Sequence, residues 1–251
     1  MKSNYIKFIY VLKKYFQKFF LIDHYFTKDN LGKLILHPWY FPEIMLLEQL
    51  KNSNRPITMF IIGAYRGDEL KKIFKTKKVS HITLFEPVPK NILILREKTK
   101  KYKEKIEIVE AAVSDFDGKI LFNETNILGN GSILKPSELA IKSYGVKQTE
   151  SFDVATVKLS TYCKNKPTPD ILWVDVQGYE LHVLQGAESI INKVKLIFIE
   201  ISIWEPTYVK GCVASELIDY LKNFEFELTQ LGTDSNGTGN ALFSKKNLES
   251  I

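Results

Sequence analysis

The sequence has few of the residues that build disulfide frameworks and zinc sites. Its 251 residues include only two cysteines, Cys163 and Cys212, and four histidines that do not cluster. Because the cysteines lie far apart and lack metal-ligand spacing, a structural zinc site is not expected. Two such residues predict free thiols in a reducing compartment, which favours a cytoplasmic location, and a single disulfide between them stays open as the alternative.

The amino terminus lacks both acidic residues and a long apolar run. Residues 1–22 contain five lysines and no acid, and their longest apolar run is Phe8–Leu12. This excludes a membrane-spanning helix and a secretory signal, and it predicts an amphipathic helix with an aromatic face and a basic face. Such a helix packs on the main domain or on a second copy in a homodimer, or it makes peripheral contact with an anionic membrane.

Beyond this segment the chain has almost no net charge. Of the net charge of +6, the lysines of residues 1–22 supply +5, which leaves +1 for the rest. A nearly neutral domain is not expected to present a broad basic face to a phosphate backbone. The charge balance therefore predicts no nucleic-acid partner.

What the chain does have is a regular alternation of strand and helix signals from residue 57 onward. Near-continuous apolar strands separated by helical spacing are typical of a parallel sheet covered on both faces. We therefore predict an α/β, Rossmann-like fold whose mostly parallel sheet has seven strands, with a helical extension over 1–56 and a main domain over 57–251. The predicted strands lie at 57–63, 81–85, 106–109, 171–176, 195–201, 226–231 and 240–243.

Two further segments have weaker signals. One helix is predicted near Pro42–Leu50, within the extension. An insertion between the third and fourth strands contains strand-like runs at Lys119–Asn123 and Val154–Leu159, which we expect to flank a polar loop over Asn123–Ser151.

Small or acidic residues follow the predicted strands at the edge where parallel α/β sheets bind their ligands. Glu86 lies 19 residues after Gly67, at the spacing with which an acid reaches a ribose diol. A glycine turn combined with such an acid predicts an adenosine-type cofactor. The residues at this edge are Gly63, Ala64, Tyr65 and Gly67 after the first strand, Glu86 and Pro87 after the second, Ala111 and Ala112 after the third, Asp175 after the fourth and Glu200 in the fifth.

NAD and S-adenosylmethionine are the two candidates for this cofactor. A pyrophosphate needs a Gly-x-Gly-x-x-Gly turn, whereas the turn here reads Gly-x-x-x-Gly with Tyr65 where the second glycine is required. S-adenosylmethionine is therefore the favoured cofactor, and an NAD oxidoreductase is the last alternative.

Five strings in order along the chain carry a family resemblance: FIIGAYRGDE, TLFEPVPKN, EAAVSDFDGKI, GSILKP and ILWVDVQGYELHVLQGA. With them the sequence resembles FkbM-type methyltransferases from about Met59 to Phe243, and most specifically over Asp175–Ala187. The resemblance implies a class I methyltransferase fold that binds S-adenosylmethionine and methylates a hydroxyl of a sugar, glycan or secondary metabolite.

The same resemblance implies roles for individual residues. The turn from Gly63 to Gly67 would hold the methionine part, and Glu86 with the adjoining Pro87 would bind the ribose hydroxyls. Ala111 and Ala112 would border the adenine, and Asp175 would face the methyl donor and the acceptor.

The sequence departs from the family pattern at three positions. Ile61 stands where aspartate is usual, Tyr65 where asparagine is usual, and Asn240 where aspartate is usual. The first two remove a carboxylate and an amide from the charged end of the cofactor. A catalytically decayed adenosine-binding or interaction protein of the same fold is therefore the alternative function.

Methylation of an alcohol requires a base close to the acceptor oxygen. Asp175 is the first candidate because the strand end directs it toward the cofactor, and Glu200 and His182 are alternatives. Glu180 is expected to serve a helix cap or dipole instead. The acceptor is predicted to meet the loop over 123–151 and the side chains of Trp204, Glu205 and Tyr208, and no pattern in the sequence indicates a metal.

Overall fold

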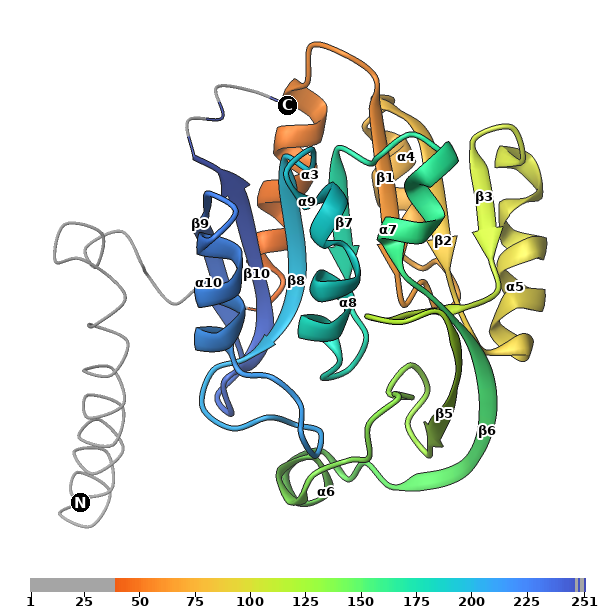
Figure 1. Ribbon diagram of the computed structural model, residues 1–251, viewed down its shortest axis with the longest axis vertical. Helices are drawn as coiled ribbons and strands as arrows, with labels where there is room; N and C mark the ends of the chain where they lie inside the picture. The colour runs from red at the N-terminus through yellow and green to blue at the C-terminus, as the bar shows by residue number, and fades with distance from the viewer. Residues whose placement is uncertain (1–38, 247, 249–250) are drawn as a thin grey trace, which may run out of the picture. The chain divides into compact units, whose positions relative to one another are not determined.

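The computed structural model describes residues 39–246, 248 and 251. Their main element is a seven-stranded sheet with the strand order β3-β2-β1-β7-β8-β10-β9 (Figure 1). The five strands from β3 to β8 pair in parallel, and β10 runs antiparallel to both of its neighbours. The predicted mostly parallel sheet is confirmed. Its strands are β1 (Ile57–Ile62), β2 (Val79–Phe85), β3 (Ile106–Val109), β7 (Ile171–Val174), β8 (Leu196–Ser202), β9 (Phe226–Thr233) and β10 (Thr238–Lys245).

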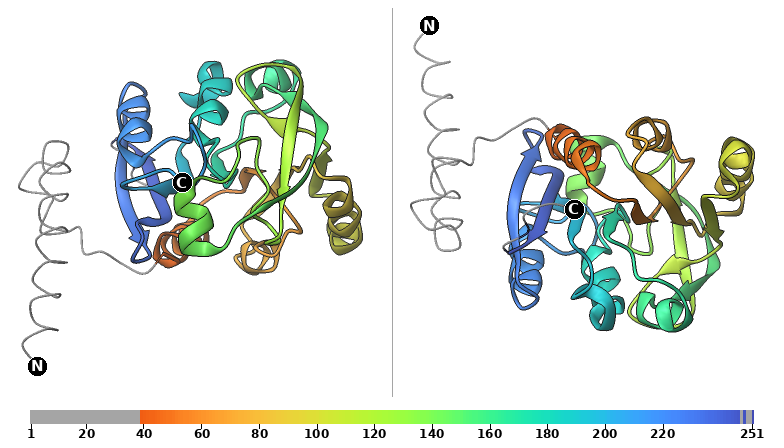
Figure 2. Two further views of the ribbon diagram at one scale, coloured as in Figure 1. Left: turned by 90° about the horizontal axis from the view of Figure 1, so that it is seen from below. Right: turned by 90° about the horizontal axis from the view of Figure 1, so that it is seen from above.

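Helices cover the sheet on both faces, as the alternating pattern predicts. Helices α3 and α4 lie on one face, and α8 and α10 lie on the other (Figure 2). The predicted amino-terminal amphipathic helix lies outside the described residues. The helices are α3 (Phe41–Asn52), α4 (Leu70–Lys75), α5 (Pro89–Thr99), α7 (Leu159–Tyr162), α8 (Glu180–Gly186), α9 (Glu188–Ile191) and α10 (Ala214–Lys222), with short 3-10 turns at Lys100–Tyr102 and Cys163–Asn165.

The alternation of side chains along β1 explains why both faces are covered. Met59 and Ile61 belong to the core cluster that also holds side chains of α3 and α4. Phe60 is buried on the opposite face, where its ring meets those of Phe85 and Tyr162. A strand buried on both sides reads as a continuous apolar run, because neither face meets water.

Helix α3 confirms the helix expected near Pro42–Leu50 and packs against the sheet. Its Leu46 and Leu50 are fully buried in the main core cluster. Asn240 of β10 donates a hydrogen bond to the carbonyl oxygen of Trp39, just ahead of this helix. Helix α3, which the prediction places in the extension over 1–56, therefore contributes side chains to the core of the domain predicted over 57–251.

A smaller second sheet lies between β3 and β7 in the sequence. It has the order β4-β6-β5, with strands β4 (Ala112–Val113), β5 (Gly118–Thr125) and β6 (Gln148–Val157). Helix α6 (Glu138–Tyr144) lies in the connection between β5 and β6 and begins at Ser137, whose hydroxyl accepts a hydrogen bond from the Ala140 amide. The loop predicted over residues 123–151 is therefore wrong at both ends and in its centre. The first four residues of β6 are exposed, and the buried end of β5 contains the polar residues Asn123 and Glu124, so neither strand end has the alternation that would have revealed it.

A basic groove lies at the amino-terminal edge of the sheet. Lys71, Lys75, Lys77, Lys101 and Lys105 line it together with a single acid, and its volume is about 550 Å³. The near-neutral charge of the domain therefore conceals a local concentration of positive charge.

Both cysteines are free thiols, so the disulfide alternative is wrong. Burial raises the pKa of Cys163 to about 11 and keeps its sulfur protonated. In the part of the chain that the structure describes, no helix combines the length and the apolar character needed to cross a membrane.

Gly63 is the position where the fold tolerates no side chain. A Cβ atom there would lie 1.8 Å from the Asp175 carbonyl oxygen, and its φ of +79° also disfavours other residues. We expect Gly63→Ala to lower the free energy of unfolding by about 3 kcal/mol or more, since overpacking adds to backbone strain. Denaturant unfolding measures this loss.

Gly145 provides the control for this substitution. It has a similar φ of +70°, but nothing lies within 4 Å of its Cβ position. Gly145→Ala should cost only about 1 kcal/mol, from the left-handed backbone alone. Equal losses in the two variants would contradict the steric explanation.

Candidate active site

The turn after β1 is attached to the end of β2. The amides of Gly63 and Ala64 both donate to the carbonyl oxygen of Phe85, at 3.1 and 3.0 Å. Tyr65 follows with a φ of +46°, a left-handed conformation that a non-glycine residue adopts only at a cost of about 1 kcal/mol. Strain of this kind is concentrated at functional sites.

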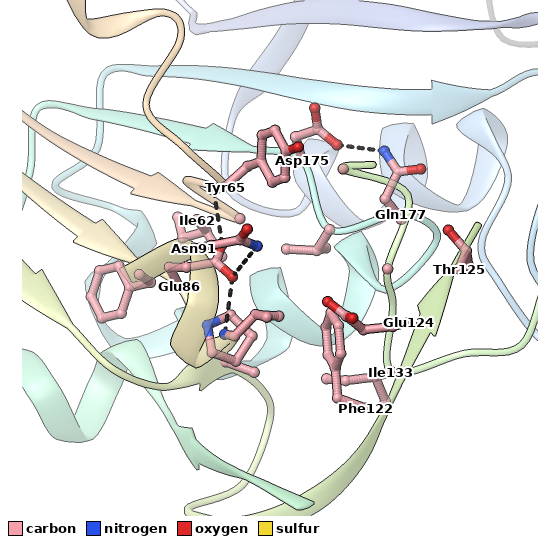
Figure 3. A pocket seen from close by; sticks show the side chains of 18 of the residues that line it. Ile62, Tyr65, Glu86, Asn91, Phe122, Glu124, Thr125, Ile133, Asp175 and Gln177 are labelled. Atoms are coloured by element: carbon pink, nitrogen blue, oxygen red, sulfur yellow. Dashed lines mark hydrogen bonds between the residues drawn. The ribbon is translucent and has the colours of Figure 1, made fainter. Parts of the chain in front are cut away.

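Glu86 holds this turn and the start of α5 together. Its carboxylate accepts hydrogen bonds from the amide of Tyr65 at 2.8 Å, the amide of Val88 at 3.0 Å and the side chain of Asn91 at 3.1 Å (Figure 3). The side chain is only 3% exposed. Burial raises the pKa of Glu86 to about 7, in spite of the three donors that favour the charged form.

A cavity of about 70 Å³ opens beside Glu86. One wall is formed by Glu86 and Asn91, and the wall across from them carries Phe122 and Ile133 of the insertion (Figure 3). The cavity continues past Tyr65 to Asp175, so that it joins the ends of β2, β1 and β7. An apolar slot next to a buried carboxylate has the chemistry of a site for a flat, hydroxyl-bearing ligand.

Asp175 belongs to a group of linked polar side chains at the far end of the cavity. The amide of Gln177 donates to Asp175 Oδ1 at 2.7 Å and to Glu200 Oε2 at 2.8 Å. Burial raises the pKa of Asp175, and burial together with the Asp175 charge raises that of Glu200 well above its ordinary value. Two carboxyls this close share a proton, because ionising both would place two like charges in a poorly solvated site.

The loop that follows β5 covers this polar group. The hydroxyl of Ser132 donates to the carbonyl oxygen of Gln177 at 2.8 Å. The Tyr208 hydroxyl lies 2.7 Å from the Asn130 carbonyl oxygen and 3.0 Å from Gln177 Oε1. Of the three side chains expected near the acceptor, Tyr208 is thus buried beside the site.

The other two acceptor candidates lie elsewhere. Trp204 packs against the β9–β10 turn, where a Cβ atom on Gly237 would lie 2.5 Å from its ring. Glu205 is exposed.

Glu180 and His182 both follow Asp175 on α8 but do not face the cavity. Glu180 accepts hydrogen bonds from the amides of Gly178 at 2.9 Å and Val176 at 3.4 Å, and so supports the turn ahead of the helix. His182 stacks on Tyr179 and lies 3.3 Å from a carboxylate oxygen of Asp115. The structure therefore separates His182 from the candidate base Asp175.

Most of the residues that the sequence assigns to the cofactor line this cavity or a second one that adjoins it. Gly67 does not, because a Cβ atom there would meet Leu70 and Leu95, and its role is helix packing. Ala111 is buried behind the lining, and Glu200 is linked to it through Gln177. The lining residues among those predicted are Gly63, Ala64, Tyr65, Glu86, Pro87, Ala112 and Asp175.

Sequence reasoning assigned no role to three further polar residues at the site. Gln177 lies inside the quoted family motif and bridges the two candidate catalytic carboxylates. Asn91 follows Glu86 by five residues on α5, and Glu69 precedes α4. A polar residue near a helix start is an ordinary surface feature in a sequence, so neither of the last two carries a signal of its own.

The site has unused hydrogen-bonding capacity that fits a ribose. A carboxylate accepts about four hydrogen bonds, and Glu86 receives three from the protein. Asn91 Oδ1 is buried with no hydrogen-bond partner among the described residues. Two acceptors with free capacity beside one cavity match the two hydroxyl donors of a ribose. No group of three or more metal-ligating side chains occurs within residues 39–246, 248 and 251.

This fold and site define a class I, Rossmann-like methyltransferase. The family model of the methyltransferase FkbM domain matches residues 62–228. The chain therefore belongs to the FkbM methyltransferase family. A curated relative, the 2-O-methyltransferase NoeI of Sinorhizobium fredii (strain NBRC 101917 / NGR234), is 27% identical over 173 residues, which cover 65% of this chain and 70% of the relative.

Solved structures of methyltransferases also resemble the chain. The methyltransferase FkbM from Methylobacillus flagellatus KT has a TM-score of 0.48 and 16% identity, covering 75% of this chain and 43% of that one. The chain thus spans less than half the length of that protein. The magnesium protoporphyrin IX methyltransferase of Synechocystis PCC 6803, solved with bound S-adenosylmethionine, has a TM-score of 0.46 and 6% identity, covering 81% and 76%.

The buried carboxyls predict an unusual pH dependence of stability. Burial raises the pKa values of Glu69, Glu86 and Glu180 to about 7, so the folded protein retains protons that the unfolded chain has released. The free energy of unfolding should therefore fall as pH rises from about 5 to about 7. Carboxyls whose pKa is lowered, such as Asp170 beside Arg55, change the free energy of unfolding only at lower pH.

Thermal unfolding of the ligand-free protein between pH 5 and 8 measures this slope. Glu86→Gln should reduce it, because one of the titrating groups is removed. Glu150→Gln, which removes an exposed carboxylate, should leave it unchanged. A melting temperature that rises across this range would show that these carboxyls do not retain their protons.

Proposed function

We propose that the protein is an S-adenosylmethionine-dependent O-methyltransferase that methylates a hydroxyl of a sugar or glycan. The observation that carries the proposal is the placement of Glu86 and Asp175 in one cavity, on either side of the turn that begins at Gly63. This order suits a ligand with a ribose at one end and a reacting methyl group at the other.

The cofactor's ribose would be held by Glu86 and Asn91, and its adenine by the apolar side of the cavity. Phe122 and Ile133 supply flat and aliphatic surface there, and Ala112 leaves room for a ring. When bound, S-adenosylmethionine supplies a methyl group activated by its positively charged sulfur. Membership of the FkbM methyltransferase family supports the assignment.

Asp175 is the residue placed to remove the acceptor's proton. Burial raises its pKa and makes its ionised form a stronger base. The hydroxyl proton of the acceptor would pass to an Asp175 oxygen, and bound S-adenosylmethionine would supply the methyl group and keep the electron pair of its carbon–sulfur bond on sulfur. Orientation of the hydroxyl in line with that bond accounts for much of the remaining acceleration.

Glu200 and Gln177 keep Asp175 in the required form. Since burial and the Asp175 charge both raise the pKa of Glu200, its carboxyl is the one that keeps its proton. The Gln177 amide bonded to Asp175 Oδ1 holds that carboxylate in one orientation. Gln177 adopts a φ of +58°, a strained backbone that directs its side chain between the two carboxyls.

The assignment to sugar hydroxyls rests on the relative and on the site. The similar protein NoeI is a 2-O-methyltransferase, which supports oxygen as the acceptor atom. In the chain itself, Gln177 and Asn130 line the cavities beside Asp175, and their polar groups suit a ligand with several hydroxyls.

A second candidate function is binding without catalysis, and Ile61 favours it. Ile61 is an aliphatic residue in the core cluster at the position where the family usually has aspartate, and it is 1% exposed. Calorimetry with S-adenosylmethionine followed by a transfer assay separates the two candidates. Binding without transfer to any of a panel of mono- and oligosaccharides would support the second candidate.

Substitutions at the two carboxylates should separate binding from catalysis. Glu86→Ala should weaken S-adenosylhomocysteine at least 10-fold, because the ribose loses a charged hydrogen-bond acceptor. Asp175→Asn should lower kcat by about 100-fold or more while that affinity changes little, because the base is lost. Calorimetry gives the affinities, and transfer of tritium from labelled S-adenosylmethionine gives kcat.

His182→Asn is the matched control, since it removes an alternative base that lies away from the cavity. It should keep kcat within about twofold of the unmodified protein. If His182→Asn lost activity while Asp175→Asn kept it, the assignment of the base would be wrong.

A further inference from the structure

A second cavity continues the first one beyond Tyr65. It has a volume of about 260 Å³, and residues of the β1 turn, of the covering loop and of the Asp175–Gln177 turn line both cavities. Together the two volumes reach the lower end of the roughly 300–1,000 Å³ typical of ligand sites. The lining residues common to both are Gly63, Tyr65, Leu128, Gly129, Asp175 and Gln177.

Glu69 is the charged side chain that the second cavity adds. Its Oε1 atom is buried and has no hydrogen-bond partner among the described residues. Burial raises the pKa of Glu69 to about 7, and the charge on Asp175 raises it further. A buried carboxylate oxygen that lacks a hydrogen-bond partner destabilises a fold unless a donor or a positive group binds next to it.

The position of Glu69 bears directly on the missing aspartate at Ile61. Both residues line the second cavity, together with Ala64, Trp173 and Asp175. Ile61 lies next to the end of β1, belongs to the apolar core and offers no charge, whereas Glu69 reaches the same cavity from the start of α4. The carboxylate that β1 lacks at Ile61 is thus supplied by Glu69, after the turn that begins at Gly63.

We propose that Glu69 binds the ammonium group of the cofactor's methionine part and so replaces the strand aspartate in this chain. The inference rests on the proposed function, because it assumes that the adenosine part occupies the first cavity. Its chemistry is general, since an ammonium group donates charge-assisted hydrogen bonds to a buried carboxylate. Tyr65 lies between the two cavities and would flank the linkage between ribose and amino acid.

Two ligands that share the adenosine part test this assignment. S-adenosylhomocysteine carries the ammonium group, whereas 5′-methylthioadenosine lacks the whole amino acid end. Calorimetry on the full chain should show Glu69→Gln weakening S-adenosylhomocysteine roughly 10- to 100-fold, and 5′-methylthioadenosine less than about twofold. Glu86→Ala should weaken both ligands.

Asp68→Asn is the matched control, because Asp68 is the adjacent acid but its side chain is exposed. It should leave both affinities unchanged. Thermal unfolding at pH 8 reports on folding: Glu69→Gln should melt at the same temperature as the unmodified protein or higher, because it removes an unpaired buried charge. A lower melting temperature would assign Glu69 to the fold and overturn the inference.

The outcomes distinguish this inference from the proposed function. If the unmodified protein binds neither ligand, both fail. If it binds S-adenosylhomocysteine and Glu69→Gln binds it equally well, only the inference fails. Equal losses for the two ligands would also overturn it, because Glu69 would then act on the adenosine part. Loss of S-adenosylhomocysteine alone supports it.

Discussion

The close contact between Gly63 and the backbone of Asp175 is the constraint on which the site depends. The Asp175 amide donates to the carbonyl oxygen of Ile62, and the Gly63 amide donates to that of Phe85, so the ends of three parallel strands are joined within a few residues. With no side chain between them, the β1 turn and the Asp175 turn border the same cavities. A larger residue would separate Glu86 from Asp175.

Several carboxyls lie in and around the site, and burial makes their ionisation unfavourable. Glu69, Glu86, Asp175, Glu180 and Glu200 all have raised pKa values, each with burial as the largest cause. Glu180 has a structural explanation in the amides that donate to it, while the Oε1 atom of Glu69 has no hydrogen-bond partner among the described residues. Proteins retain such destabilising groups where a ligand or a reaction uses them.

The sequence predicted the sheet and the two main carboxylates for a general physical reason. Parallel strands place their carboxyl ends on one edge, so Glu86 and Asp175 could be brought together without knowledge of any contact. Glu69 and Asn91 could not be found in this way, because they lie on helix starts, where side-chain direction depends on how the helix packs. Gly67 has the glycine signal of a ligand turn, but the space it leaves is filled by Leu70 and Leu95.

The insertion shows a second limit of sequence reasoning. The first residues of β6 are exposed, so their backbone pairing with β5 leaves no hydrophobic alternation to detect. The contribution of α3 to the core was equally hidden, since an isolated helix pattern does not state which surface it covers. Both features depend on contacts between segments distant in the chain.

The loop between β5 and α6 has a kinetic consequence. Leu128, Gly129 and Gly131 from this loop line the smaller cavity, and Ser132 and Asn130 attach the loop to Gln177 and Tyr208. A molecule bound beside Glu86 therefore lies against this loop. Any shift of the loop that widens the cavity must break or lengthen some of these hydrogen bonds, so the contacts with Gln177 and Tyr208 influence how fast a bound molecule enters and leaves.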